Sequence, residues 1–367
     1  MQQPWKKILS LLGLSILSAC SSNAQINEAD STSNSLTHKD SISIAAVGDV
    51  MLGSNYPSIG FLPDNDHNIL KEASPILKGA DIAVGNLEGT LFDSGGSPKS
   101  CSDPSICYVF RMPSHYGKYL VEAGFDFLSI ANNHSNDFGD EGRAYTMKNL
   151  DELGIKYAGL TGKAEQAFLD KNGTKYGFVS FAPNSGTVNI NDLDNATRLI
   201  RDTKQKSDIV IVMFHGGAER ASHQHIPRKN EIFYGENRGD VFKFARNAVN
   251  AGADIVFGQG PHVVRAIELY KGKFISYSGG NFATYGAFNI KGPNGLAPIF
   301  KIDIDKKGNF LSGQIYPFIQ YGGQNGMLGT LPDKNNTVIK KIIELNKSDF
   351  PEGNGLSVSP DGMITKK

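Results

Sequence analysis

The chain has 367 residues, a length that suits one large α/β domain with attached segments better than a single small domain. Its 37 lysines and arginines are balanced by 37 aspartates and glutamates, so the formal net charge is zero. This balance excludes the basic footprint of a nucleic-acid-binding protein. Many of the 41 glycines follow apolar runs, which indicates tight strand-to-helix turns.

The N-terminal residues predict an export signal with a lipid attachment site. Residues 1–19 contain two lysines, then an apolar stretch, and end in LSA before Cys20. This ending resembles a bacterial lipobox, which predicts lipidation of Cys20, and a simple signal peptide cleaved near Ala24 is the alternative. The apolar stretch of about ten residues is too short for a membrane-spanning helix. Because no aspartate follows Cys20, we expect the outer membrane, facing the periplasm, in a Gram-negative cell.

Two further segments fit an exported protein. Residues 20–40 are rich in serine and asparagine and nearly free of large apolar side chains, which predicts a flexible tether. The two remaining cysteines, Cys101 and Cys107, lie close together in the sequence CSDPSIC. In an exported protein this pair predicts a small disulfide-closed loop that stiffens a surface insertion. Two free thiols are the alternative.

From residue 41 onward, apolar runs alternate with glycine- or asparagine-rich turns and with helical patterns. Strands are predicted at 42–47, 81–84, 125–130, 177–182, 209–214, 255–257 and 274–277. Helices are predicted at 67–77, 116–123, 144–153, 194–205 and 238–251. The rest of the chain predicts strands at 298–305 and 310–319 and a hairpin at 356–365, without a further helix. The alternation predicts a layered α/β fold, with residues 41–325 as one domain and 326–367 as a C-terminal extension.

Polar side chains follow the strand predicted at 125–130. Asn132, Asn133 and His134 come almost directly after it, and Asp137 follows three residues later. Open α/β sheets place ligand sites at the carboxyl ends of their strands. An amide beside an imidazole and a carboxylate suits a two-metal hydrolytic site. A turn with an asparagine cap before the next helix is the alternative.

Other predicted strands are followed by polar residues at the same position. These residues are Asp49, Glu88, His215, His262 and Asn281. Glycines lie near each of them and would let the backbone approach a metal ion or a phosphate closely. Carboxylate, amide and imidazole donors without cysteine suit Mn, Fe or Zn. The set is large enough for a pair of metal ions that share one carboxylate.

Six segments carry a resemblance to a known family. In chain order they are GDVMLG, GNLEGTL, ANNHSNDFG, HGGAE, GPHV and YSGGNF. Together they resemble the bacterial CapA family of capsule and poly-γ-glutamate synthesis proteins, a branch of the calcineurin-like metallophosphatase superfamily. The resemblance covers residues 43–282 and continues more weakly to residue 319. It implies a layered αββα sandwich with ligands at the carboxyl ends of the strands.

The resemblance also implies two metal ions and an acid. The implied ligands are Asp49, Glu88 and His262 for the first ion, and Glu88, Asn133 and His215 for the second. His134 would face the leaving group as a catalytic acid, and Asp137 would orient its imidazole. The chemistry would be in-line attack of water on phosphorus, with both metals stabilising the charged oxygens.

One position departs from the superfamily pattern, whose last ligand motif ends in H-x-H. Gly260, preceded by Gln259, stands where the first of these histidines is expected. The second metal site is therefore expected to be weak, absent or completed by water. His223 and His225, in the sequence SHQHIP, are candidates to replace the missing imidazole. The alternative is that both are exposed loop residues.

Further side chains are candidates for contact with a substrate. Arg111 and Arg265 suit bidentate binding of phosphate or carboxylate, with ordinary structural ion pairs as the alternative. Asn281 is expected to reach a ligand or to hold its turn. Glu219 is expected to fix His215 or to cap a helix. Three aromatic residues are candidates for a cleft wall or for the core: Tyr285, Phe288 and Tyr321.

Two functions fit these features. The first is a lipid-anchored, metal-dependent hydrolase of the cell envelope that acts on ester bonds, as phosphoesterases do. The second is an accessory protein for the synthesis or export of an anionic envelope polymer such as poly-γ-glutamate, or a degenerate scaffold that binds such a polymer without catalysis. The expected partners are the polymer or a phosphoester, the membrane, and other synthesis or export proteins.

Overall fold

Two β-sheets packed face to face form the centre of the fold. The computed structural model describes residues 41–101 and 107–367. The predicted signal sequence, the predicted lipidation site at Cys20 and the predicted tether lie outside these residues. All the described residues belong to one compact unit of the chain, residues 39–367. The two sheets meet where the ring of Phe127 stacks on that of Phe178, with 4.4 Å between the ring centroids.

The first sheet combines a parallel part with an antiparallel part. Its strand order is β19-β20-β17-β16-β1-β2-β5-β6, with β15 also pairing with β1 and β18 with β17. The strands are β1 (Ser41–Met51), β2 (Ile82–Leu87), β5 (Phe127–Ser129), β6 (Lys156–Ala158), β15 (Asn281–Thr284), β16 (Leu296–Asp305), β17 (Phe310–Gly322), β18 (Leu328–Pro332), β19 (Leu356–Val358) and β20 (Met363–Lys366). Strands β1, β2, β5 and β6 run parallel, so their carboxyl ends lie at one edge.

The second sheet has the order β13-β14-β12-β9-β8-β7. Its strands are β7 (Gln166–Lys171), β8 (Thr174–Phe181), β9 (Ile209–His215), β12 (Ile255–Gln259), β13 (Ile267–Tyr270) and β14 (Lys273–Ser276). The four inner strands are parallel, and the two edge strands pair antiparallel to them. Two short pairs lie outside both sheets: β3 (Thr90–Leu91) with β4 (Arg111–Met112), and β10 (Ile232–Phe233) with β11 (Glu236–Asn237).

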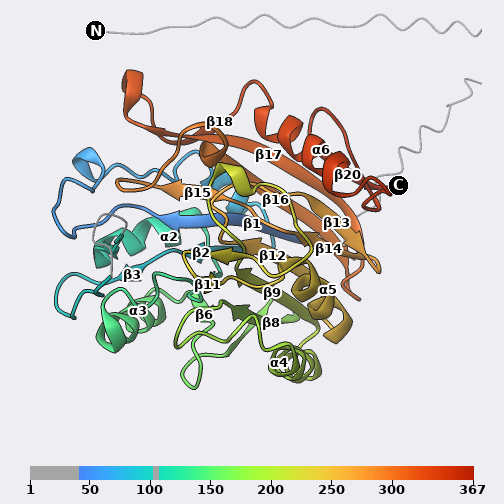
Figure 1. Cartoon of the computed structure of the whole chain (residues 1–367), viewed down its shortest axis with the longest axis horizontal. Helices are drawn as coiled ribbons and strands as arrows, with labels where there is room; N and C mark the ends of the chain where they lie inside the picture. The colour runs from blue at the N-terminus through green and yellow to red at the C-terminus, as the bar shows by residue number, and fades with distance from the viewer. Residues whose placement is uncertain (1–40, 102–106) are drawn as a thin grey trace, which may run out of the picture. The chain divides into compact units, whose positions relative to one another are not determined.

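Helices cover the outer faces of both sheets. On the first sheet lie α1 (Ser74–Lys78), α2 (Gly117–Ala123) and α3 (Gly139–Glu152). On the second sheet, α4 (Leu193–Gln205) packs on β8 and β9, and α5 (Val241–Ala251) packs on β12. The last helix, α6 (Thr337–Asp349), packs on β16 and β17 and touches β13 (Figure 1). These layers confirm the αββα sandwich predicted from the sequence.

Alternating side chains of β1 show why both faces of the first sheet are covered. Ile44 and Ala46 belong to the core between the two sheets. Ala45 and Val47 face the other way and pack with Leu77 of α1. A strand that is apolar on both faces has to be buried on both faces, and this strand is.

The end of the chain differs from the sequence expectation. The helix α6 was not predicted, and its buried residues, Val338, Ile339, Ile342 and Leu345, follow a helical spacing. Residues 326–367 extend the first sheet, because β18 pairs with β17 and β20 also pairs with β17. The helix predicted at 67–77 was also wrong in extent, since only α1 forms there. Within the described residues, no helix is long and apolar enough to cross a membrane.

Candidate metal centre

The carboxyl ends of the parallel strands of both sheets bring the predicted metal ligands together. In the first sheet Asp49 lies opposite Asn86, two residues before Glu88. In the second sheet His215, the last residue of β9, lies opposite Gln259, three residues before His262. The side chains of Asp49, Glu88 and His215 are almost completely buried. Strand pairing places each of these pairs at the carboxyl edge of its own sheet, and the contacts between Asp49 and His262 and between Glu88 and His215 join the two edges.

The distances within this cluster are short. His262 Nδ1 lies 2.9 Å from Asp49 Oδ2, and His215 Nε2 lies 3.3 Å from Glu88 Oε1. Ligand atoms of Asp49, His215 and His262 all lie within 4.8 Å of one another. The backbone of His262 has a positive φ of 58°, a left-handed conformation. An ion placed among these atoms would have carboxylate and imidazole donors around it.

Several buried polar atoms of the cluster have no hydrogen-bond partner. They include His215 Nδ1 and, in the cavity wall, Asn133 Oδ1, while Glu88 Oε1 and His215 Nε2 meet only each other, at 3.3 Å and without a hydrogen bond. Buried polar atoms are nearly always hydrogen-bonded, so a group of unpaired ones calls for an explanation. A divalent ion would satisfy acceptor atoms of this kind, and carboxylate with imidazole suits Zn, Mn or Fe. The residues present therefore fit a metal ion.

The charges of the cluster are strongly coupled. Burial and the neighbouring Glu88 raise the pKa of Asp49 above its ordinary value. Burial also acts to raise the pKa of Glu88, but His215 outweighs it and the pKa is lowered. Burial acts to lower the pKa of His262, yet the hydrogen bond that its Nδ1–H donates to Asp49, together with the charge of that carboxylate, prevails and raises the pKa to about 10.

Metal binding to the metal-free chain is expected to release protons. With a pKa of about 10, His262 is protonated at neutral pH and has to lose that proton to bind an ion. The affinity for a divalent ion should therefore rise with pH, by up to about tenfold per unit below pH 10. Calorimetric titration at pH 7 in buffers of different ionisation enthalpy measures the released protons. Zero release would contradict the assignment of His262 as a ligand.

Two asparagines that sequence reasoning did not assign support the carboxylates. Asn86 Nδ2 donates to Asp49 Oδ1 at 2.8 Å and also to Glu88 Oε2. Asn132 Nδ2 donates to Asn86 Oδ1 at 3.1 Å and to the carbonyl of Leu87 at 2.8 Å. The signal that could have found Asn86 is its spacing, because residues two apart in a strand share a face.

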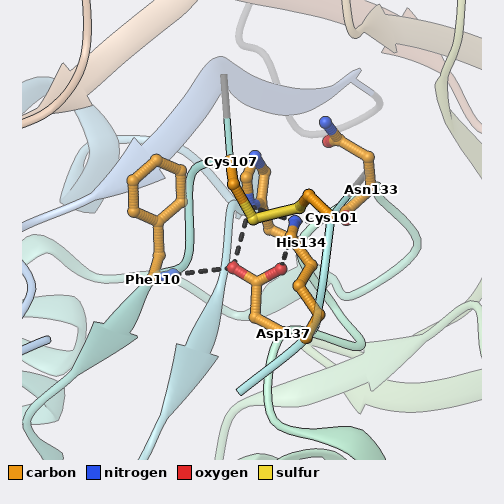
Figure 2. Close-up of a disulfide and its surroundings, with 7 residues drawn as sticks. Cys101, Cys107, Phe110, Asn133, His134 and Asp137 are labelled. Carbon is orange, nitrogen blue, oxygen red and sulfur yellow. Dashed lines mark hydrogen bonds and ion pairs between the residues drawn. A yellow bond between two sulfur atoms is a disulfide. The ribbon is translucent and has the colours of Figure 1, made fainter. Parts of the chain in front are cut away.

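His134 and Asp137 form a hydrogen-bonded pair (Figure 2). His134 Nδ1 lies 2.8 Å from Asp137 Oδ2, so Nε2 is the ring nitrogen left to meet a substrate. Asn132 Oδ1 accepts from the backbone N–H of His134 at 3.0 Å, which is an Asx turn. The helix-capping alternative does not hold, because α3 begins at Gly139 without a side-chain cap. Asn133 follows in the same turn and offers its unpaired oxygen.

A cavity of about 850 Å³ opens over the cluster. Its walls include Asn133, His134, Glu219, His262, Asn281 and Phe288. Asn281 Oδ1 is buried without a hydrogen-bond partner, while its Nδ2 donates to the carbonyls of Asn289 and Asn294. Glu219, which was expected to fix His215, lies beside His262 instead, with Oε2 3.9 Å from His262 Nε2. It also forms an ion pair with Arg238 at 3.0 Å. Histidine nitrogen, carboxylate and amide oxygen thus face one space.

Both arginines predicted to bind substrate are engaged elsewhere. Arg265 is fully buried, and its guanidinium donates to both carboxylate oxygens of Glu231 at 2.8 and 2.7 Å. Arg111 does not line the cavity. Its Nε donates to Asn55 Oδ1 at 2.7 Å, and its guanidinium lies over the ring of Phe138. Both predictions are corrected, because each guanidinium already has protein partners. Arg265 forms the structural ion pair that was the alternative to substrate binding.

The aromatic candidates are divided in the same way. Phe288 lines the cavity, whereas Tyr285 and Tyr321 do not. Tyr285 is one of the partly buried residues packed against the core on the helix side of the first sheet.

The cysteines Cys101 and Cys107 are joined by a disulfide, and Cys101 lies in the cavity wall.

No imidazole takes the position of the missing histidine in the described part of the chain. Gly260 has a φ of 117°, and a Cβ built on it would lie 2.6 Å from both the nitrogen and the oxygen of Gly216. A histidine would therefore clash with backbone there. His225 pairs with Asp349 at the end of α6, and the His223 ring contacts Ser222 and Phe233 while its carbonyl accepts from Arg265. The alternative that both histidines are loop residues rather than replacements therefore holds.

The αββα layers with a candidate metal centre at the carboxyl ends of the strands define a metallophosphatase-like protein. Residues 43–285 match the family model described as "Bacterial capsule synthesis protein PGA_cap". The chain belongs to this family, which confirms the resemblance predicted from its six segments.

Two curated relatives and one solved structure show what the chain is similar to. It is 27% identical over 261 residues to the capsule biosynthesis protein CapA of Bacillus anthracis, covering 66% of this chain and 60% of that protein. It is 29% identical over 258 residues to the PGA biosynthesis protein CapA of Bacillus subtilis strain 168, covering 66% and 63%. The match thus spans less than two thirds of either relative. The calcineurin-like phosphoesterase YfkN of Bacillus subtilis aligns with 85% of this chain and 98% of that chain, with 13% identity and a TM-score of 0.45.

Proposed function

We propose that this chain binds a divalent metal ion and hydrolyses an ester bond, of the phosphoester type, in the synthesis or export of an anionic capsule polymer. One observation carries the proposal. Buried ligand atoms of His215 and Asn133 that lack a hydrogen-bond partner lie with Asp49, Glu88 and His262 beneath a cavity that also exposes His134. Structural carboxylates and histidines are paired within the protein, whereas these are partly unpaired. Perturbed groups of this kind in a cleft mark functional sites.

The residues divide into ligands and an acid. Asp49, Glu88 and His262 would hold one ion, and Glu88, His215 and Asn133 would hold a second more weakly because Gly260 offers no donor. Mn, Fe or Zn suits this donor set. Bound there, a divalent ion supplies Lewis-acid stabilisation of charged oxygens and a more acidic water.

The His134–Asp137 pair carries the proton transfer. Because the Asp137 carboxylate can only accept, His134 Nδ1 carries the hydrogen of their shared bond. When the imidazole is protonated, Nε2–H faces the cavity and can donate to a leaving oxygen. Asp137 fixes the orientation of the ring during this transfer. The cavity volume of about 850 Å³ leaves room for a substrate larger than a phosphate.

The capsule assignment rests on the family and on the N-terminal sequence. Both curated relatives are named for capsule or PGA biosynthesis. Lipidation at Cys20 would hold the domain at the membrane through the tether, in the outer membrane facing the periplasm if the cell is Gram-negative. An anionic polymer, or a phosphoester formed during its assembly, would be the partner in the cavity, together with other synthesis or export proteins.

A second function is a binding scaffold without catalysis, and the clash at Gly260 favours it. If the second ion cannot be held, the cavity would still bind an anionic polymer. The two functions differ in turnover and share the metal site.

The deciding experiment measures metal and turnover on the full chain. We expect at least one Mn, Fe or Zn ion per chain by elemental analysis, and metal-dependent cleavage of an aryl phosphate or phosphodiester. Bound metal without cleavage of any ester across a metal panel would overturn the hydrolase and support the scaffold. Absence of metal under all loading conditions would overturn both.

A further inference from the structure

The disulfide between Cys101 and Cys107 lies beside the His134–Asp137 pair (Figure 2). Lys99 stands two residues before the first cysteine, and Phe110 stands three residues after the second. Both residues contact Asp137, one from each side of the closed loop. The disulfide therefore ties together the two chain segments that hold this carboxylate.

The segment before the disulfide makes four contacts with the pair and its turn, one of them a donation from Lys99 Nζ to the carbonyl of Asn133 at 3.5 Å. Lys99 Nζ lies 2.5 Å from Asp137 Oδ1 and 3.4 Å from His134 Nδ1. Its backbone N–H donates to the carbonyl of Asp137 at 2.7 Å. The side chain of Asp137 is fully buried, and that of Lys99 is 25% exposed. A buried carboxylate without a cation would be costly, so Lys99 supplies its counter-charge.

The segment after the disulfide contacts both Asp137 and His134 through Phe110. The backbone N–H of Phe110 donates to Asp137 Oδ2 at 2.6 Å. The Phe110 ring lies 4.3 Å from the His134 ring, centroid to centroid, and limits where the imidazole can turn. Asp137 Oδ2 thus accepts from Phe110 and from His134, while Oδ1 meets Lys99.

We propose that Lys99 is a positioning residue for His134, and that the Cys101–Cys107 disulfide holds Lys99 and Phe110 on Asp137 so that the imidazole keeps one orientation. Lys99 acts through Asp137: it fixes the carboxylate, and the carboxylate fixes His134 Nδ1. A disulfide that closes a short loop adds less to global stability than one that closes a long loop. Its effect is local, on the two segments beside the acid.

The first test reads His134 directly in the metal-free chain, so it does not depend on the proposed function. The ring nitrogens of His134 are followed by nitrogen-15 NMR, and its signal is assigned with a His134→Gln chain. Unaltered protein should show Nδ1 protonated and a slowly exchanging Nδ1–H. In Lys99→Met, and in the double variant Cys101→Ser with Cys107→Ser, that proton should exchange faster and the two tautomers should mix. If the double variant does not fold, mild reduction of the folded chain by a phosphine gives the same comparison.

The control is Lys163→Met, which removes a lysine that pairs with Asp140 at 2.7 Å on the surface. Its His134 signals should match those of the unaltered chain. Unchanged His134 signals in both Lys99→Met and the disulfide-free chain would overturn the proposal. So would an equal change in Lys163→Met, because it would show a general loosening of the fold.

The second test is kinetic and rests on the proposed function. Lys99→Met should lower kcat by about 10- to 100-fold, the usual effect of losing an outer partner of a functional group, with KM and metal content little changed. Lys99→Arg, which keeps the charge, should recover part of the loss. A rise in KM with kcat unchanged would instead make Lys99 a substrate-binding group and overturn the positioning role. If no variant, including the unaltered chain, shows turnover, the proposed function fails while the NMR result stands.

Discussion

A chain that carries Asp49→Asn is expected to keep its fold and to lose most of its bound divalent metal. Asp49 is buried, accepts from Asn86 and lies 2.9 Å from His262, so the amide retains its shape but loses the charge that attracts a cation. Loss of an outer partner costs about 10- to 100-fold in metal affinity, and a direct ligand should cost more. Hydrolysis should fall by about 10³-fold, because the ion contributes several kcal/mol to the transition state.

The measurements are metal per chain after gel filtration and the melting temperature with and without metal. In metal-free protein the melting temperature should change little, because relief of the burial cost and of the repulsion from Glu88 offsets the weakened pairing with His262. Only the rise in melting temperature on adding metal should disappear. Asp303→Asn, on the neighbouring strand β16, is the matched control and should behave as the unaltered chain. Full metal content in Asp49→Asn would remove Asp49 from the ligand set.

The metal cluster could be predicted from the sequence because the strands that carry it are parallel. Asp49, Glu88 and His215 each lie at the carboxyl end of an apolar run, and parallel strands bring such ends to one edge. The His134–Asp137 contact was likewise accessible, since the two residues are close in the chain. Short sequence separation predicts the contact between His134 and Asp137, and the direction of the strands predicts the grouping of Asp49, Glu88 and His215.

Contacts made through loops could not be predicted in the same way. Arg265 pairs with Glu231, which lies 34 residues earlier in a segment without strand or helix periodicity. A guanidinium binds a protein carboxylate and a phosphate by the same bidentate geometry, so residue type could not decide. Lys99 was missed for the same reason, because its contact with Asp137 is made from a segment outside the strands and helices.

The helix α6 shows a different limit. Its sequence begins TVIKKII, and valine, isoleucine and threonine are residues that favour strands. Val338, Ile342 and Leu345 are buried against the strands of the first sheet, and this burial stabilises the helix because the three residues share one of its faces. Tertiary packing therefore overrides the local preference.

The second large effect is expected in a His134→Gln chain, which should retain its metal and lose its acid. His134 lines the cavity through a ring whose Nδ1 is held by Asp137, so glutamine keeps a polar group there but cannot transfer a proton. General acid catalysis contributes about 10²- to 10⁴-fold, so kcat should fall by an amount in that range. Elemental analysis should find the same metal per chain as in the unaltered protein.

The leaving group decides whether this loss reflects acid catalysis. A nitrophenyl ester leaves as a stable anion and needs little protonation, whereas an alkyl ester needs its oxygen protonated as the bond breaks. His134→Gln should therefore lower kcat far more for an alkyl phosphate than for a nitrophenyl phosphate, and Asp137→Asn should show the same order with smaller losses. Equal losses on both substrates would assign His134 to binding or to metal support. A selective loss would connect the Nδ1–Asp137 hydrogen bond to the proton that Nε2 donates.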